Sequence, residues 1–112
     1  MKTIDLKARA LSDETGESIF GLAHTGSHAC YMIYGILKPK EKNRLIQPGL
    51  GHEEMIIAVK GDLEVTGQVT VTLNEGCAFH LKGDASVYLE NKGDGPAEYV
   101  ISGGHSEDGH QH

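Results

Sequence analysis

The feature that most constrains the fold is the segment 51–65, which reads GHEEMIIAVKGDLEV. Its apolar run at 55–59 is short and contains β-branched residues, so it predicts a strand that is buried on both faces. Gly61 and Asp62 interrupt this run before the alternating residues 63–65 begin. Glycine next to aspartate is typical of a tight turn, so the segment predicts two consecutive strands.

Short segments of the same kind recur along the chain, separated by turn residues. The chain has 15 glycines and no tryptophan, as expected for short strands joined by tight turns. Further strands are expected at 2–6, 18–22, 29–37, 45–47, 69–73, 77–82, 86–90 and 97–102. In the segment 29–37 both the odd-numbered and the even-numbered residues are mostly apolar, which predicts that both faces of this strand are buried or nearly so. No segment of a dozen residues has helical periodicity, so the predicted fold class is all-β, as a sandwich or barrel.

Composition narrows the range of partners. At 112 residues the chain is expected to form a single domain. Its 16 acidic residues outnumber the 10 basic ones, and the formal net charge of −6 argues against a nucleic-acid partner. The start has no apolar leader, and the apolar runs are far shorter than a membrane span. We therefore expect no membrane partner and a cytoplasmic location.

Two segments resemble the sequence motifs of the cupin superfamily. The first motif's end is similar to EMIIAVKGDLEV at 54–65, and the second motif is similar to GCAFHLKGDASVYLENKGDGPAEYV at 76–100. Asn91 and the GDGP turn after it stand where the second motif places them. The resemblance covers 48–102, about half of the chain. It implies a jelly-roll β-barrel, often dimeric, with a site inside the barrel.

The cupin motifs also supply four metal ligands: two histidines spaced H-x-H, a glutamate, and a histidine from the second motif. Counted back from the glycine turn, the glutamate position falls on Glu54. The two H-x-H positions fall on Pro48 and Leu50, and the last histidine position falls on Val87 or on Ser86. The resemblance therefore implies one of the four standard ligands in this sequence.

A different metal site could be built from His52, Glu54 and His80. The spacing of His52 and Glu54 puts both side chains on one face of a strand, and His80 would complete the set if it points inward. Imidazole and carboxylate ligands with open positions suit Zn, Ni, Mn or Fe. The alternative is that His52 is a turn residue, Glu53 and Glu54 are solvated, and His80 bonds a neighbour.

The C-terminal residues 105–112 are expected to form a flexible tail after a barrel domain at 1–104. The tail carries His105, His110 and His112 beside Glu107 and Asp108. Histidine-rich tracts can bind metals. The alternative is a solvated tail, since ordering a glycine-containing segment on binding costs entropy.

The cysteines are expected to be buried and structural. Cys30 and Cys77 both lie in apolar strand-like runs, where cysteine is usually a small buried hydrophobe. His24 and His28 precede Cys30, and a Cys–His pair can form a nucleophile only if the thiol is exposed. A disulfide between the two cysteines is possible but not implied.

These observations leave three hypotheses for the function. The first is a binding barrel whose apolar interior, with candidates Met32, Ile36, Phe79 and Val87, holds a small organic ligand or a divalent metal. The second is a metal-dependent enzyme of dioxygenase or isomerase type that uses the relocated metal ligands. The third is a non-catalytic scaffold whose exposed strand edges recruit a partner. A homodimer is expected in each case.

Overall fold

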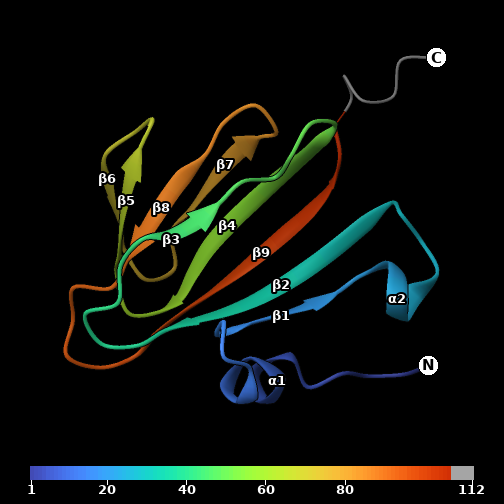
Figure 1. The fold of residues 1–112 in the computed structure, drawn as a ribbon, viewed down its shortest axis with the longest axis horizontal. Helices are drawn as coiled ribbons and strands as arrows, with labels where there is room; N and C mark the ends of the chain where they lie inside the picture. Colours follow the sequence, from blue (N-terminus) through green and yellow to red (C-terminus); the bar gives the residue numbers. More distant parts are fainter. Residues whose placement is uncertain (107–112) are drawn as a thin grey trace.

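The computed structural model describes residues 1–106, which form two antiparallel sheets and two short helices (Figure 1). The elements in chain order are α1 (Leu6–Ser12), β1 (Glu17–Phe20), α2 (Leu22–Thr25), β2 (Cys30–Leu37), β3 (Arg44–Ile46), β4 (His52–Lys60), β5 (Leu63–Gly67), β6 (Val71–Leu73), β7 (Ala78–Lys82), β8 (Val87–Glu90) and β9 (Ala97–His105). One sheet has the order β1-β2-β9-β4-β7 and the other β3-β8-β5-β6. The predicted all-β fold with a β4–β5 turn at Gly61 is confirmed.

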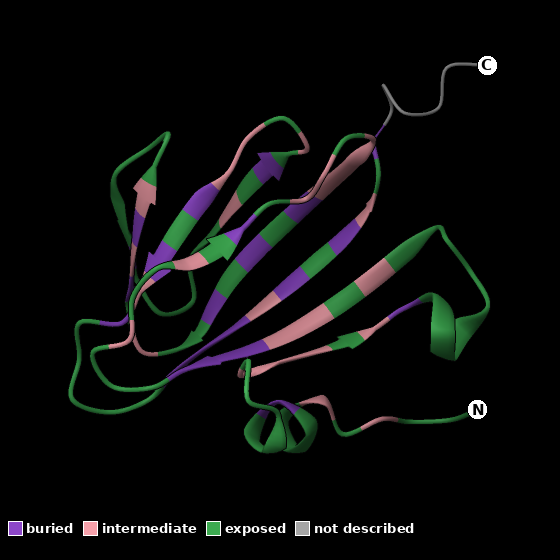
Figure 2. Ribbon diagram, viewed as in Figure 1, coloured by how far each residue is buried: buried purple, intermediate pink, exposed green. Residues whose placement is uncertain are grey.

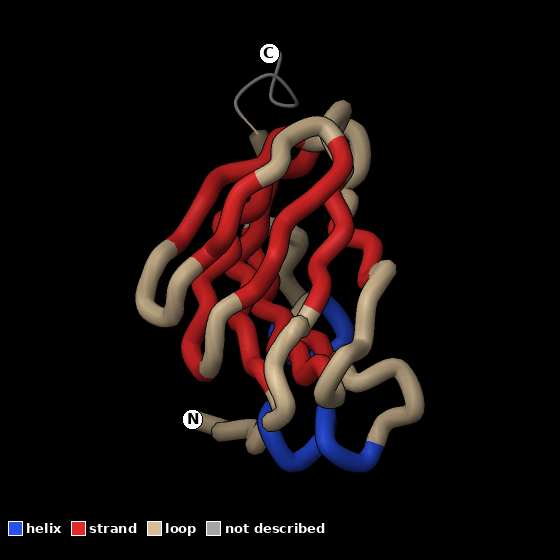
Figure 3. Tube along the Cα trace, turned by 90° about the vertical axis from the view of Figure 1, so that its left-hand side faces the viewer, coloured by secondary structure: helices blue, strands red, loops and turns tan. Residues whose placement is uncertain are grey.

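The inner faces of the two sheets enclose one apolar core. The buried core residues come from both sheets: Leu37, Ile46, Ile56, Ala58, Leu63, Val65, Leu73, Leu81, Val87, Leu89, Ala97, Tyr99 and Ile101. Because successive strand residues face opposite sides, buried and exposed bands alternate along β4 and β9 (Figure 2). Figure 3 shows that strands make up most of the regular structure and that the helices lie outside the sheets.

The prediction that β4 is buried on both faces is wrong. Its inner residues, such as Ile56, are buried, whereas Met55 on the outer face is 58% exposed and Ile57 and Val59 are exposed as well. The prediction for β2 fails in the same way, because Met32 is exposed on the outer face. Antiparallel sheets can present one face to solvent, and an apolar outer row makes such a strand resemble a fully buried one in sequence.

Residues 2–5 belong to no strand, contrary to the strand expected at 2–6, and helix α1 begins at Leu6. Asp5 caps α1, and its Oδ1 accepts a hydrogen bond of 2.9 Å from the Ala8 N–H. At seven residues α1 is too short for its periodicity to be recognised. The second helix, α2, is a single turn that ends at Gly26, whose φ is +73°. None of the helices among residues 1–106 is long and apolar enough to span a membrane.

Helix α1 covers part of the outer face of β2. Ala10 of the helix and Ile36 of β2 are both buried. The buried Glu98 carboxylate fastens the helix, since Lys7 Nζ lies 3.2 Å from its Oε2 and the Tyr34 hydroxyl donates to its Oε1. Helix α1 therefore covers one end of the outer face of the sheet, whereas Met55, Ile57 and Val59 of β4 remain exposed on that face.

Both cysteines differ from the prediction. Cys30 and Cys77 are free and exposed rather than buried. Cys30 is the first residue of β2, and Cys77 precedes β7, which begins at Ala78. Neither thiol packs into the core, because each stands at a strand end rather than inside a strand.

A tyrosine of β9 crosses a glycine of β2 on the inner face. Gly35 is the register partner of Tyr99, and a Cβ at Gly35 would overlap the Tyr99 ring. The ring lies over Gly35 and its hydroxyl donates to Glu17 of β1. Arg44 Nη1 donates to the same hydroxyl at 2.8 Å. The glycine thus makes room for a side chain that connects three strands.

Replacing Gly35 with alanine should destabilise the fold. The added methyl would overlap the fully buried Tyr99 ring, and overpacking of this kind costs about 1–3 kcal/mol of unfolding free energy. Urea denaturation measures the loss, and in a Tyr99→Leu background the same substitution should cost less. Gly95→Ala is the matched control because a Cβ there would meet nothing within 4 Å. Equal costs at Gly35 and Gly95 would contradict this account of the packing.

Replacing Glu98 with glutamine should change stability in a pH-dependent way. Burial alone would raise the pKa of Glu98, but the hydrogen bond from Tyr34 and the Lys7 charge outweigh it, and the pKa lies below its ordinary value of 4.5. A lowered pKa contributes stability above the ordinary value and loses it as pH falls through the folded-state value. Urea unfolding should therefore show Glu98→Gln less stable at pH 7, with the gap from the natural chain shrinking in acid. A gap of constant size would argue against this role.

Candidate functional site

A second tyrosine crosses a glycine near the other end of the same sheet. Tyr31 of β2, Gly103 of β9 and Glu54 of β4 stand in one row of register partners. A Cβ at Gly103 would overlap the Tyr31 ring, so the glycine lets this ring lie across β9. The Tyr31 hydroxyl donates a hydrogen bond to Glu54 Oε2. Three strands thus place a phenol and a carboxyl together on the inner face.

Glu54 is a buried acid on an otherwise apolar stretch of β4. The residue is 5% exposed, and the next inner residues, Ile56 and Ala58, belong to the core. Burial raises the pKa of Glu54; repulsion from Glu17 adds to this effect, while the Tyr31 hydrogen bond and the nearby His52 reduce it without cancelling it. Burial and the carboxylate together also raise the pKa of the Tyr31 hydroxyl. The alternative in which Glu54 is solvated is therefore wrong.

Two histidines follow in the next inner row, at the start of β4 and the end of β9. His52 and His105 are register partners, and their ring centroids are 5.3 Å apart. The His52 ring also packs edge-on against Tyr31, with 6.1 Å between centroids. His105 is exposed and His52 is half-buried, so this row reaches solvent. We call Tyr31, His52, Glu54 and His105 the mouth cluster.

The third member of the expected metal site lies on the opposite face of the sheet. His80 is the register partner of the exposed Met55, whereas Glu54 pairs with the buried Leu81. Its Nε2 lies 2.7 Å from Glu53 Oε1 on the outer face. The structure therefore brings His52 and Glu54 together but not His80. Within residues 1–106, no group of three histidine, cysteine, aspartate or glutamate side chains is arranged to hold a metal ion.

The donor set of a standard cupin metal site is also missing. Pro48 and Leu50 lie in the loop before β4 and offer no side-chain ligand atom. Val87 is fully buried in the apolar core on β8, in the other sheet. Glu54, the remaining position, is bonded to Tyr31. The residues at these four positions therefore cannot form a standard cupin metal site.

The histidines of the expected C-terminal tail and of α2 fall into three places. His105 belongs to β9, so the barrel extends beyond the expected boundary at Gly104. His110 and His112 lie outside the described residues. The Nδ1 of His24 accepts a hydrogen bond of 3.3 Å from the Gly21 N–H at the start of α2, which is a structural role.

The interior residues predicted from the sequence divide between the two faces. Val87 is in the core and Phe79 packs against it, as predicted. Met32 and Ile36 lie on the outer face, Met32 exposed and Ile36 buried among residues that include α1. Register explains the errors, because a change of one residue moves a side chain to the other face.

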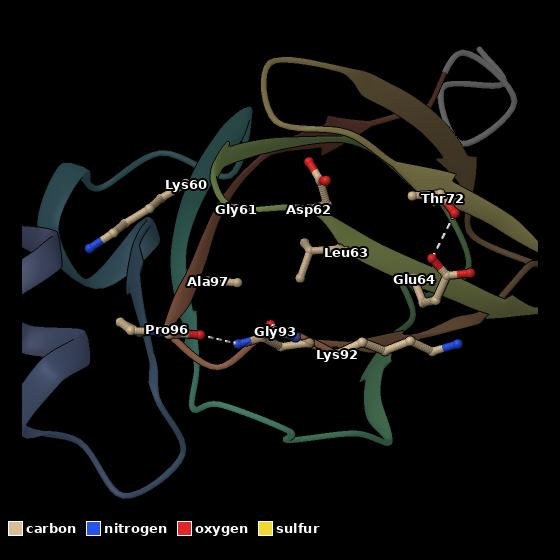
Figure 4. Close-up of a pocket in the computed structure, with 12 residues that line it drawn as sticks. Lys60, Gly61, Asp62, Leu63, Glu64, Thr72, Lys92, Gly93, Pro96 and Ala97 are labelled. Atoms are coloured by element: carbon tan, nitrogen blue, oxygen red, sulfur yellow. Dashed lines mark hydrogen bonds between the residues drawn. The ribbon is translucent and has the colours of Figure 1, made fainter.

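A cleft of about 590 Å³ lies at the far end of β4, near Lys60 and Lys92 (Figure 4). The polar side chain of Asn91, which lines this cleft, has a structural role. Asn91 is buried and its Nδ2 donates to the carbonyls of Leu37, Lys38 and Gly95, while its Oδ1 accepts from the Gly93 N–H. These bonds hold the loop before β9. The mouth cluster is therefore the better candidate for a functional site.

Sequence reasoning identified His52, Glu54 and His105 but missed Tyr31 and Gly103. The sequence did contain an indication of this arrangement: in each of the two apolar strands, a tyrosine and a glycine are separated by an even number of positions and so lie on the same face. To interpret it, one must know which residue of β2 pairs with which residue of β9. These strands are far apart in the sequence, so the sequence alone does not determine that register.

Comparison with known proteins gives the fold. No protein-family model and no curated protein matches the sequence. A solved protein from Thermus thermophilus is 19% identical with a TM-score of 0.69, covering 94% of this chain and 98% of that one. The cupin domain of an XRE family transcriptional regulator from Enterobacter cloacae is 17% identical with a TM-score of 0.66, covering 81% and 98%. A cupin-superfamily sugar phosphate isomerase from Silicibacter pomeroyi is 19% identical with a TM-score of 0.61, covering 94% and 68%. The chain is therefore a small cupin-fold protein, an all-β jelly-roll barrel.

Proposed function

We propose that this protein is a binding barrel for a small hydroxyl-bearing organic molecule, which contacts the Tyr31–Glu54 pair at the mouth cluster. One observation carries the proposal: Glu54 is buried on the inner face, yet the described chain gives its carboxyl a single hydroxyl partner. Burial of a carboxyl is costly unless hydrogen bonds compensate. A polar ligand would supply those bonds.

The hydrogen-bonding capacity of the pair supports this assignment. A carboxyl group has about four lone-pair sites, and Tyr31 uses one of them on Glu54. The Tyr31 hydroxyl oxygen can itself accept a bond while its proton is donated to Glu54. Hydroxyl groups of a ligand both donate and accept, so they match both atoms. His52 and His105 offer further polar contacts at the rim.

Binding is favoured over the enzymatic alternative. The dioxygenase or isomerase considered from the sequence depends on a metal held by His52, Glu54 and His80, and His80 lies on the opposite face of the sheet from the other two. Fold alone does not carry activity. The neighbour from Silicibacter pomeroyi is named a sugar phosphate isomerase, and we use this name only to choose a first probe. Hexoses and hexose phosphates present several hydroxyls on a small frame.

The test is an NMR titration of the full chain with glucose and glucose 6-phosphate, in EDTA to remove metal ions. We expect shifts in the backbone amides of Tyr31, Glu54 and Gly103. Tyr31→Phe removes only the hydroxyl and should weaken binding by about 1 kcal/mol, or roughly fivefold. Glu53→Gln, one residue away on the outer face, is the matched control and should bind like the natural chain.

Two results would contradict the proposal. One is the absence of shifts at the mouth cluster with every hexose and hexose phosphate tried. The other is a response confined to the cleft between Lys60 and Lys92, which would move binding to the other end of the barrel.

A further inference from the structure

We infer that His52 and His105 form a two-imidazole site for a divalent transition metal ion such as Ni²⁺ or Zn²⁺ at the rim of the barrel. This site differs from the set expected from the sequence, because His80 is on the other face. It also differs from a standard cupin site, whose three histidine positions fall here on Pro48, on Leu50 and on Val87 or Ser86. The inference stands apart from organic-ligand binding, since it uses the rim histidines rather than the Tyr31–Glu54 bond.

The geometry of the pair fits a shared ion. His52 and His105 face each other on neighbouring antiparallel strands and project from the same face of the sheet. Their ring centroids are 5.3 Å apart and the ring planes are inclined by 53°. Zinc–nitrogen bonds measure about 2.0–2.1 Å, which puts two imidazoles on one tetrahedral ion about 5 Å apart between centroids. Small side-chain rotations would therefore bring one nitrogen of each ring to a common ion.

The backbone on both sides of the pair is fixed. The His52 N–H donates to the Gly49 carbonyl at 3.1 Å, before β4. The Ser106 N–H donates to the Gly51 carbonyl at 2.9 Å, just beyond the end of β9. These bonds hold the two strand ends together where they would otherwise fray. An ion would then bind to positions that are already ordered, which lowers the entropy cost.

The His52 ring is oriented but chemically available. Tyr31 packs edge-on against it and limits its rotation. Among residues 1–106, no hydrogen bond occupies a ring nitrogen of His52. The exposure of His105 gives an ion access from solvent. The His52 ring thus has a fixed place and an open nitrogen.

Charge and ligand type select the ion. Imidazole suits Zn²⁺, Ni²⁺ and Cu²⁺, whereas Mg²⁺ and Ca²⁺ prefer oxygen ligands. Glu54 is two residues from His52 on the same face and the chain carries a formal charge of −6, so a cation is attracted. Glu54 remains bonded to Tyr31 and is not counted as a ligand. Water would complete the coordination, as in other sites with open positions.

The test is a calorimetric titration of the untagged full chain with Ni²⁺ and with Zn²⁺. We expect about one ion per chain. His52→Ala and His105→Ala should each weaken binding by at least about tenfold, since even outer-shell partners of metal ligands are worth that much. His80→Ala removes a histidine from the outer face, and the double variant His110→Ala/His112→Ala removes the last two histidines of the chain. Both controls should bind like the natural protein.

Three results would overturn the inference. They are no binding of Ni²⁺ or Zn²⁺ by the natural chain, unchanged binding after loss of His52 and His105, or binding abolished by the His110/His112 control. If His52→Ala fails to fold, His105→Gln at the exposed position and the Cu²⁺ EPR spectrum decide the matter, because two coordinated imidazoles should be seen in the natural chain and one in the variant. The metal titration contains no organic ligand and the sugar titration contains EDTA, so either proposal can fail alone.

Discussion

The five-stranded sheet depends on a tyrosine that lies across a glycine of the neighbouring strand. The arrangement occurs twice, in opposite directions. Tyr99 of β9 crosses Gly35 of β2, and Tyr31 of β2 crosses Gly103 of β9. Each ring needs the missing side chain, and each hydroxyl ends at a carboxylate on the strand beyond the glycine. The sheet thereby gains two large rings on its inner face and two internal hydroxyl–carboxylate pairs.

The two hydroxyl–carboxylate pairs differ in whether a positively charged side chain lies beside the carboxylate. Arg44 donates to the Tyr99 hydroxyl and also lies 3.8 Å from Glu17, so the first pair has a fixed positive charge beside it. The same guanidinium bonds Glu41 at 2.9 Å and is almost fully used. Glu54 has no arginine beside it, and burial raises its pKa by more than the Tyr31 hydrogen bond and His52 lower it. The first pair is therefore complete as structure, whereas the second retains hydrogen-bonding capacity.

The sequence was sufficient for the fold class and for the β4–β5 turn. It was insufficient for the faces of the strands. An apolar run such as 55–59 is compatible with burial on both sides or on one, since nothing local says what covers Met55. The placement of His80 failed for a related reason: its face is set by pairing with β4, and a slip of one residue reverses it. Helix α1 was missed because the Asp5 cap and the Glu98 contact determine it, rather than its own periodicity.

The fold determines where polar groups meet, and local sequence determines which groups they are. β4 and β9 are central, adjacent and antiparallel, so the first residue of one lies beside the last residue of the other. A histidine at each of these positions is brought to the mouth whatever occupies the loop before β4. Pro48 and Leu50 leave two of the standard positions in that loop without a ligand, whereas Glu54 keeps the glutamate position and bonds to Tyr31. A change of a few residues at strand ends can therefore alter which polar groups meet at the mouth while the buried core of the barrel stays the same.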